Sequence, residues 1–209
     1  MAMRIWMGAW TVGAMVAGAS VVCVEEALGS PVLTVTIHVT DNANLSPTEL
    51  AGAQAYATAA YRAAGFHIVW SSAPWKPEAG QSAGPPSVDV RVVIAPADMA
   101  EKKCREENLG DSVLGVAISG ASELRGRIVY VFYHRIERVA MAHHAPVPRG
   151  LGHVVAHEVG HALIGVDSHG GGGLMGLMAA KWNPRRSRPQ TFTRNQAQQI
   201  RRRFITALE

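Results

Sequence analysis

Cysteine and aromatic residues are scarce in this chain of 209 residues. The two cysteines, Cys23 and Cys104, allow at most one disulfide bond. Aromatic residues make up only 6% of the sequence, and the arginine-rich stretches near the C-terminus lack both base-stacking aromatics and a recognisable nucleic-acid-binding module. The sequence also lacks an internal repeat. We therefore interpret the net charge of +4 as solvated basic surface and expect no nucleic-acid partner.

The first 29 residues have the order of an export signal, in which Arg4 precedes an uncharged run over residues 5–24. Small residues allow cleavage after Ala19 or after Gly29, and only the first choice leaves both cysteines available to pair. The run is about 20 residues long, so an uncleaved membrane anchor is the alternative. Its many alanines and glycines favour cleavage. We expect an exported protein, periplasmic or secreted, that is membrane-anchored only if this segment stays uncleaved.

Residues 31–209 have the composition of one globular domain. A hydrophobic content of 48% is enough to bury one sizeable core, and nothing in the sequence predicts a second. We expect this domain to be a monomer. Alternating patterns rich in β-branched residues predict five strands, over residues 31–39, 66–70, 87–95, 113–118 and 127–133.

Capping motifs predict the helices outside the central motif. Residues 46–49 read Ser-Pro-Thr-Glu, a capping box with proline at the first helical position, and predict a helix that ends at Gly65. Thr193 with Gln196 forms a second capping box, which predicts a closing helix near the C-terminus. The charged residues 101–107 predict a solvated loop or a short helix without a chemical role.

Residues 157–161 read His-Glu-Val-Gly-His and carry the clearest chemical signal. Residues four apart on a helix share one face, so His157 and His161 can present two imidazole nitrogens to one metal ion. Glu158 lies about 100° further round the helix and can reach a water molecule held by that metal. Apolar spacing around the motif predicts a helix that Gly165 ends. The alternative interpretation is a surface helix that happens to carry two histidines.

A catalytic zinc ion takes three protein ligands and keeps a fourth position for water, so a third ligand must follow the helix. Asp167 stands at the ten-residue separation from His157 that the long zincin motif gives its third ligand. The glycine of that motif comes one residue late here, at Gly165, which favours His169 over Asp167. His153, one turn before the motif, could approach or shield the metal. We expect it to support the site or face solvent, because the open position must be preserved.

These motifs resemble those of the metzincin clan of zinc metallopeptidases over residues 151–182. More narrowly, the segment is similar to exported bacterial proteins that carry His-Glu-Ile-Gly-His, a Gly-containing turn, Ser-His, Gly-Ile-Met and a tryptophan. The matching elements of this chain are His157 to His161, Gly165, Ser168-His169, Gly176-Leu177-Met178 and Trp182. A looser likeness extends back to the first predicted strand.

The resemblance implies an α+β, metzincin-like zincin fold, with a twisted mixed five-stranded sheet packed on two long helices. The upper part, residues 31–165, would hold the sheet and the active-site helix. The lower part, residues 166–209, would form a short C-terminal subdomain with the third ligand, a methionine-containing turn and the last helix. The spacing to Trp182 favours Met178 for that turn, with Met175 as the alternative.

The motif and the resemblance together predict a zinc endopeptidase. Glu158 would take a proton from a zinc-activated water and return it to the leaving amine. A peptide or protein substrate would bind as an added strand along residues 113–118, as the resemblance implies. Two alternatives use the same histidines: an exported zinc-binding module without catalysis, and a zinc-dependent hydrolase of a cell-wall amide. The chain departs from the clan in its stretched spacing to His169 and in lacking a recognisable propeptide.

Overall fold

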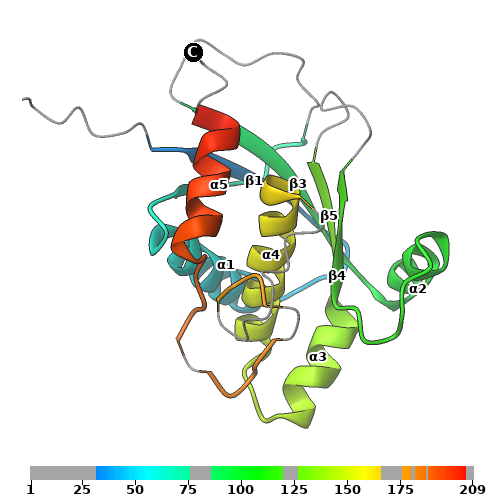
Figure 1. The fold of residues 1–209 in the computed structure, drawn as a ribbon. Helices are drawn as coiled ribbons and strands as arrows, with labels where there is room; N and C mark the ends of the chain where they lie inside the picture. Colours follow the sequence, from blue (N-terminus) through cyan, green and yellow to red (C-terminus); the bar gives the residue numbers. More distant parts are fainter. Residues whose placement is uncertain are drawn as a thin grey trace, which may run out of the picture. The chain divides into compact units, whose positions relative to one another are not determined.

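The computed structural model describes residues 32–75, 86–119, 127–165, 176–179, 182–186 and 188–205. Within these residues the chain has an α+β fold of five helices and one mixed five-stranded sheet (Figure 1). The elements are β1 Thr34–Asp41, α1 Pro47–Arg62, β2 His67–Ser71, β3 Ser87–Ala95, α2 Ala97–Glu106, β4 Gly115–Ser119, β5 Arg127–Phe132, α3 Tyr133–Ala142, α4 Val147–Ile164 and α5 Arg194–Ile205. The predicted fold class, α+β with a mixed five-stranded sheet, is confirmed.

The strands lie in the order β2-β1-β3-β5-β4. The first four strands are parallel to one another, whereas β4 is antiparallel to β5 and forms one edge of the sheet. Helix α1 connects β1 to β2, as a crossover between parallel strands requires. Since β4 pairs only with β5, its other side lacks a strand neighbour among the described residues.

Alternation along the strands places two separate hydrophobic clusters on the two faces of the sheet. Val131 belongs to the main core with α1 and α4, while the adjacent Phe132 joins Ala95, Ala100 and Cys104 in a smaller cluster beneath α2. Helices α1 and α4 are the longest described helices, and they pack closely because Gly152 lacks a side chain. A Cβ at that position would lie 2.5 Å from the carbonyl oxygen of Ala53. The predicted pair of long helices therefore covers one face of the sheet.

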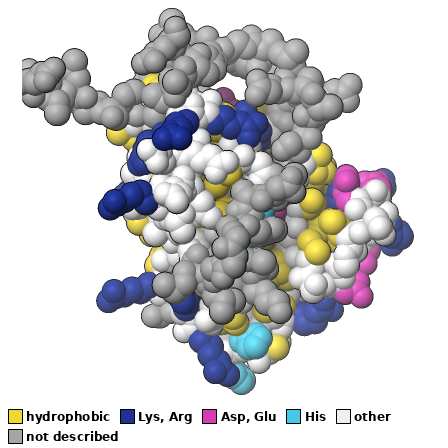
Figure 2. Space-filling model, viewed as in Figure 1, with side chains coloured by type: hydrophobic (Ala, Val, Ile, Leu, Met, Phe, Trp, Pro, Cys, Tyr) yellow, Lys and Arg dark blue, Asp and Glu magenta, His cyan; other side chains and the backbone are white. Residues whose placement is uncertain are grey.

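Helix α5 closes this face by binding the ends of the two long helices. Arg201 donates a hydrogen bond to the carbonyl of Ala64, just beyond α1, at 2.5 Å. Arg203 donates to the carbonyls of Leu163 and Ile164, at the end of α4, at 3.3 Å each. In Figure 2 basic side chains are scattered along the α5 side of the molecule, whereas acidic ones gather beside α2. Two of the four arginines of α5 thus cap helices, in addition to contributing to a basic surface.

Both predicted capping boxes are confirmed. Ser46 accepts from the backbone N–H of Glu49, whose carboxylate accepts in turn from the backbone N–H of Ser46. Thr193 and Gln196 exchange the equivalent hydrogen bonds at the start of α5. All five predicted strands form, with ends displaced by one to three residues at several positions.

Of the two forms predicted for residues 101–107, the short helix is confirmed: all but Glu107 belong to α2, which begins at Ala97 and buries Ala100 and Cys104 against the sheet. Helix α3 was not predicted, and the strand expected to reach residue 133 ends at Phe132, where α3 begins directly. Both helices are only ten residues long, so a periodic pattern has few helical turns in which to show.

Cys104 is buried, and Cys23 lies outside the described residues. The same holds for the export signal and its cleavage sites. None of the helices described is both long and apolar enough to cross a bilayer.

Candidate functional site

Helix α4 places the two motif histidines in the interior of the domain. Pro148 lies in its first turn, where a missing backbone N–H costs no hydrogen bond. The helix is buried almost all round, which excludes the alternative of a surface helix. It ends at Gly165, as predicted, and a positive φ of 123° there suits glycine. The helical spacing then brings the rings of His157 and His161 to a centroid separation of 4.7 Å.

The two imidazoles present their Nε2 atoms to each other at 3.0 Å. On the opposite side of each ring, Nδ1 faces a backbone carbonyl: that of Leu177 at 2.8 Å from His157, and that of Gly165 at 3.4 Å from His161. Carbonyl oxygens can only accept hydrogen bonds, so a tautomer with the proton on Nδ1 would satisfy both carbonyls and turn the two Nε2 lone pairs toward each other. In that tautomer the lone pairs would repel at 3.0 Å unless a proton or a metal ion lay between the two Nε2 atoms.

This donor set fits a zinc ion. Two imidazole nitrogens on one tetrahedral zinc ion lie about 3.3 Å apart, close to the separation found here. Backbone carbonyls on Nδ1 are the usual outer supports of zinc-binding histidines. Within the described part of the chain, no three His, Cys, Asp or Glu side chains group so as to hold a metal. Both candidates for the third ligand, His169 and Asp167, lie outside the described residues.

A turn over residues 176–179 packs against helix α4 at His157 and Gly160. Leu177 supplies the backbone carbonyl that lies against Nδ1 of His157, and Met178 is buried against Gly160. A Cβ on Gly160 would lie 2.5 Å from the sulfur of Met178, so this glycine lets the methionine pack directly under the motif. The assignment of Met178 to a methionine turn beneath a metal stays a prediction. Met175, the alternative, lies outside the described residues.

Glu158 is 8% exposed and faces the edge strand β4. A Cβ on Gly115 would lie 2.7 Å from its Cγ, and the backbone N–H of Ala117 donates a hydrogen bond to its carboxylate. Burial raises the pKa of Glu158 to about 8, while the hydrogen bond from Ala117 opposes the rise. A carboxyl group with a pKa near neutral can both accept and return a proton, which is what a general base and acid must do.

A cleft of about 670 Å³ lies over these residues, between α4 and the edge strand. Its walls are mainly apolar. Three charged residues line it among the described residues: Asp111, Arg138 and Glu158. The other described lining residues are Ser112, Val113, Leu114, Gly115, Val116, Ala117, Val139, His153, Val154, His157, His161, Ala179 and Trp182. The cleft therefore joins the paired imidazoles, the carboxyl group and residues of the edge strand β4 in one space.

His153 forms part of the cleft wall and does not face solvent, since only 2% of it is exposed. Its ring stacks between His157, at 6.2 Å, and Trp182, at 6.0 Å between ring centroids. Burial and the neighbouring His157 lower the pKa of His153 to about 3, so the ring is neutral. Its Nδ1 is buried and has no hydrogen-bond partner in the described ranges. The expected supporting role agrees with this position, and the solvent-facing alternative is wrong.

Several residues of the site carry no signal that a motif search detects. Gly115 and Ala117 sit in an ordinary strand pattern, and Leu177 acts only through its carbonyl. Trp182 was part of the resemblance, but its contact with Gly150 depends on tertiary packing: a Cβ there would lie 2.7 Å from the indole ring. Comparisons with protein-family models, with curated proteins and with solved structures found no match for this chain.

Proposed function

We propose that the protein is a zinc-dependent endopeptidase of the metzincin type. His157 and His161 would hold the ion together with His169, or with Asp167 as the alternative. The observation that carries this proposal is the pair of Nε2 atoms 3.0 Å apart, each backed by a carbonyl on Nδ1, beside a buried carboxyl group in an open cleft. The sheet order, with a single antiparallel edge strand beside the cleft, agrees with this proposal.

Zinc, when bound, supplies Lewis-acid chemistry: it lowers the pKa of a water molecule towards about 7 and polarises a carbonyl group. Glu158 accepts the proton of the attacking water and passes it to the amine that leaves. Its position suits this role, because Gly115 leaves room for the side chain and the Ala117 N–H donates toward the carboxylate. Neutral His153 and the indole of Trp182 exclude water from one wall of the cleft.

The substrate would lie along β4. Among the described residues this strand pairs with β5 on one side only, and an extended peptide can add to such an edge through backbone hydrogen bonds. Residues 113–117 line the cleft next to Glu158, so a peptide on this edge would bring its backbone to the catalytic carboxyl group. The mainly apolar cleft walls suit a peptide with apolar side chains.

The decisive experiment combines metal analysis with hydrolysis of casein and of a peptide library. We expect about one zinc ion per chain, activity that chelation abolishes, and a loss of about 10²-fold to 10⁴-fold in Glu158→Gln with zinc retained. Full activity in Glu158→Gln would overturn the mechanism. Bound zinc without hydrolysis would identify a non-catalytic zinc module, and release of products only from peptidoglycan would identify a cell-wall amide hydrolase.

A further inference from the structure

Arg135 is an almost fully buried cation that does not belong to the candidate metal site. Its side chain is 2% exposed, at the start of α3, and it lies over the ring of Phe132 with 5.5 Å from Cζ to the ring centroid. Burying a guanidinium is unfavourable unless acceptors surround it. The acceptors therefore indicate what the residue does.

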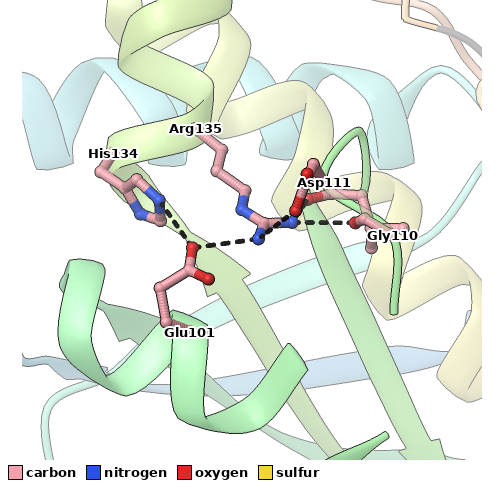
Figure 3. A network of polar contacts seen from close by, with 6 residues as sticks. Glu101, Gly110, Asp111, His134 and Arg135 are labelled. Carbon is pink, nitrogen blue, oxygen red and sulfur yellow. Dashed lines mark hydrogen bonds and ion pairs between the residues drawn. The ribbon is translucent and has the colours of Figure 1, made fainter. Parts of the chain in front are cut away.

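Most of these acceptors belong to the α2–β4 loop, residues 107–114. Nη1 of Arg135 donates to the carbonyls of Gly110 and Val113, at 3.0 and 3.1 Å. Nη2 donates to Glu101 at 3.0 Å and lies 3.8 Å from the carboxylate of Asp111. Figure 3 shows the guanidinium between Glu101 on α2 and the loop that carries Gly110 and Asp111. One side chain of α3 thus joins α2, the loop and the approach to β4.

The loop held by Arg135 is also a wall of the cleft. Asp111, Ser112, Val113 and Leu114 line the cleft, and the chain then enters β4, where Gly115 and Ala117 contact Glu158. Leu114 is fixed on its other side, because its carbonyl accepts from the N–H of Phe132 at 2.8 Å. The loop between α2 and this point depends on Arg135 for two of its carbonyl partners.

We propose that Arg135 is a positioning residue that holds the α2–β4 loop as the substrate-binding wall of the cleft, with Glu101 fixing the guanidinium in place. The proposal rests on the endopeptidase function proposed above, because the loop is a substrate wall only if a peptide occupies β4. Arginine suits the role better than lysine, since its planar fork can donate to two carbonyls and a carboxylate at once. Arg135 is remote from the reacting atoms and acts through the loop.

Arg135→Met, Arg135→Lys and Glu101→Gln test this role, with Arg105→Met as the matched control. Arg105 is an exposed arginine of α2, and we expect wild-type behaviour from its variant. In Arg135→Met the KM for a peptide should rise about tenfold or more, while kcat stays within about twofold and zinc content is unchanged. Arg135→Lys should lie between that variant and the wild type, and Glu101→Gln should raise KM by less than Arg135→Met.

Hydrogen exchange provides a readout that does not depend on activity. Faster exchange in Arg135→Met, confined to residues 110–117 while α4 keeps its protection, supports the positioning role even if the wild type hydrolyses no peptide. In that case only the endopeptidase function fails. An unchanged KM in an active Arg135→Met, or unchanged exchange over 110–117, overturns the proposal. If Arg135→Met does not fold, the same comparisons apply to Arg135→Lys and Glu101→Gln. Hydrogen exchange and KM that equal those of the wild type in both variants would then overturn the proposal.

Discussion

The sulfur of Met178 occupies the place where a side chain on Gly160 would begin. A Cβ added there would lie 2.5 Å from the sulfur and 3.1 Å from the ring of Phe192. Gly160 lies between the two histidines of the motif in sequence, so any displacement of the helix at this point moves the paired imidazoles.

Gly160→Ala should therefore damage both stability and metal binding. We expect a loss of about 1–3 kcal/mol in the free energy of unfolding, since the added methyl group overpacks the core. Zinc affinity should fall about 10-fold to 100-fold, because His157 and its support from Leu177 move apart. Urea unfolding and competitive zinc titration measure the two effects. Gly110→Ala is the control, since a Cβ there meets nothing within 4 Å; equal losses in both variants would contradict the argument.

Gly115→Ala should reduce catalysis while leaving the metal in place. Its Cβ would lie 2.7 Å from Cγ of Glu158 and 2.9 Å from the carbonyl oxygen of Tyr130, and that carbonyl is fixed in the sheet. The carboxyl group must then move, and a misplacement of about 1 Å can lower the rate about 10²-fold. Steady-state kinetics with zinc analysis check this expectation. Wild-type kcat in the variant would show that Glu158 tolerates the displacement.

Metal-free protein should become less stable as the pH rises from about 4.5 to about 8. The pKa of Glu158 is about 8 in the folded chain and near 4.5 in the unfolded chain, so within this window the unfolded state releases the proton that the folded state retains. The resulting loss of stability is complete about one pH unit above the folded pKa and amounts to about 5 kcal/mol. Glu158→Gln removes the ionisation and retains an acceptor for the Ala117 N–H.

Near pH 4 Glu158 is protonated in both the folded and the unfolded chain, so its ionisation should not affect stability there. Urea unfolding in the presence of chelator should therefore give the wild type and Glu158→Gln the same free energy of unfolding near pH 4. The variant should be the more stable protein at pH 8. Zinc should reverse the preference for the neutral acid, since a nearby cation favours the carboxylate. Parallel pH–stability curves for the two chelated proteins would show that the folded state does not retain this proton.

Substitution of the two candidate third ligands separates them directly. His169→Ala should lose zinc, with an affinity reduced by at least about 10²-fold, whereas Asp167→Ala should retain it. Metal analysis after dialysis, with circular dichroism as a control for folding, measures the difference. If only Asp167→Ala loses zinc, the assignment of His169 is wrong.

The sequence was sufficient to predict the parts of the fold that local patterns encode. The strand alternation, both capping boxes and the stop at Gly165 depend on neighbours in the chain, and all are present. Helices α2 and α3 were missed in whole or in part because their stability comes from packing. Arg135 at the start of α3, for example, is buried only because α2 and the α2–β4 loop surround it.

The candidate site divides in the same way. The spacing of His157 and His161 predicted that the two rings share a face, since one helix determines it. Their carbonyl partners could not be predicted, because any residue can supply a carbonyl and only tertiary structure brings Leu177 to the helix. The role of Gly115 could not be predicted either, because it depends on the side chain of Glu158, which comes from another element, α4.

The carbonyls of Gly165 and Leu177 also have a consequence for how the site can vary. They flank the segment that contains both candidate third ligands, and each is held by a ring that the helix already orients. The two ends of that segment are therefore fixed independently of what joins them. Because loop-closure entropy grows only slowly with length, residues can be inserted between these two points at little cost. The orientation of the two imidazoles therefore does not depend on the number of residues between Gly165 and Leu177. A longer spacing to the third ligand need not disturb His157 and His161.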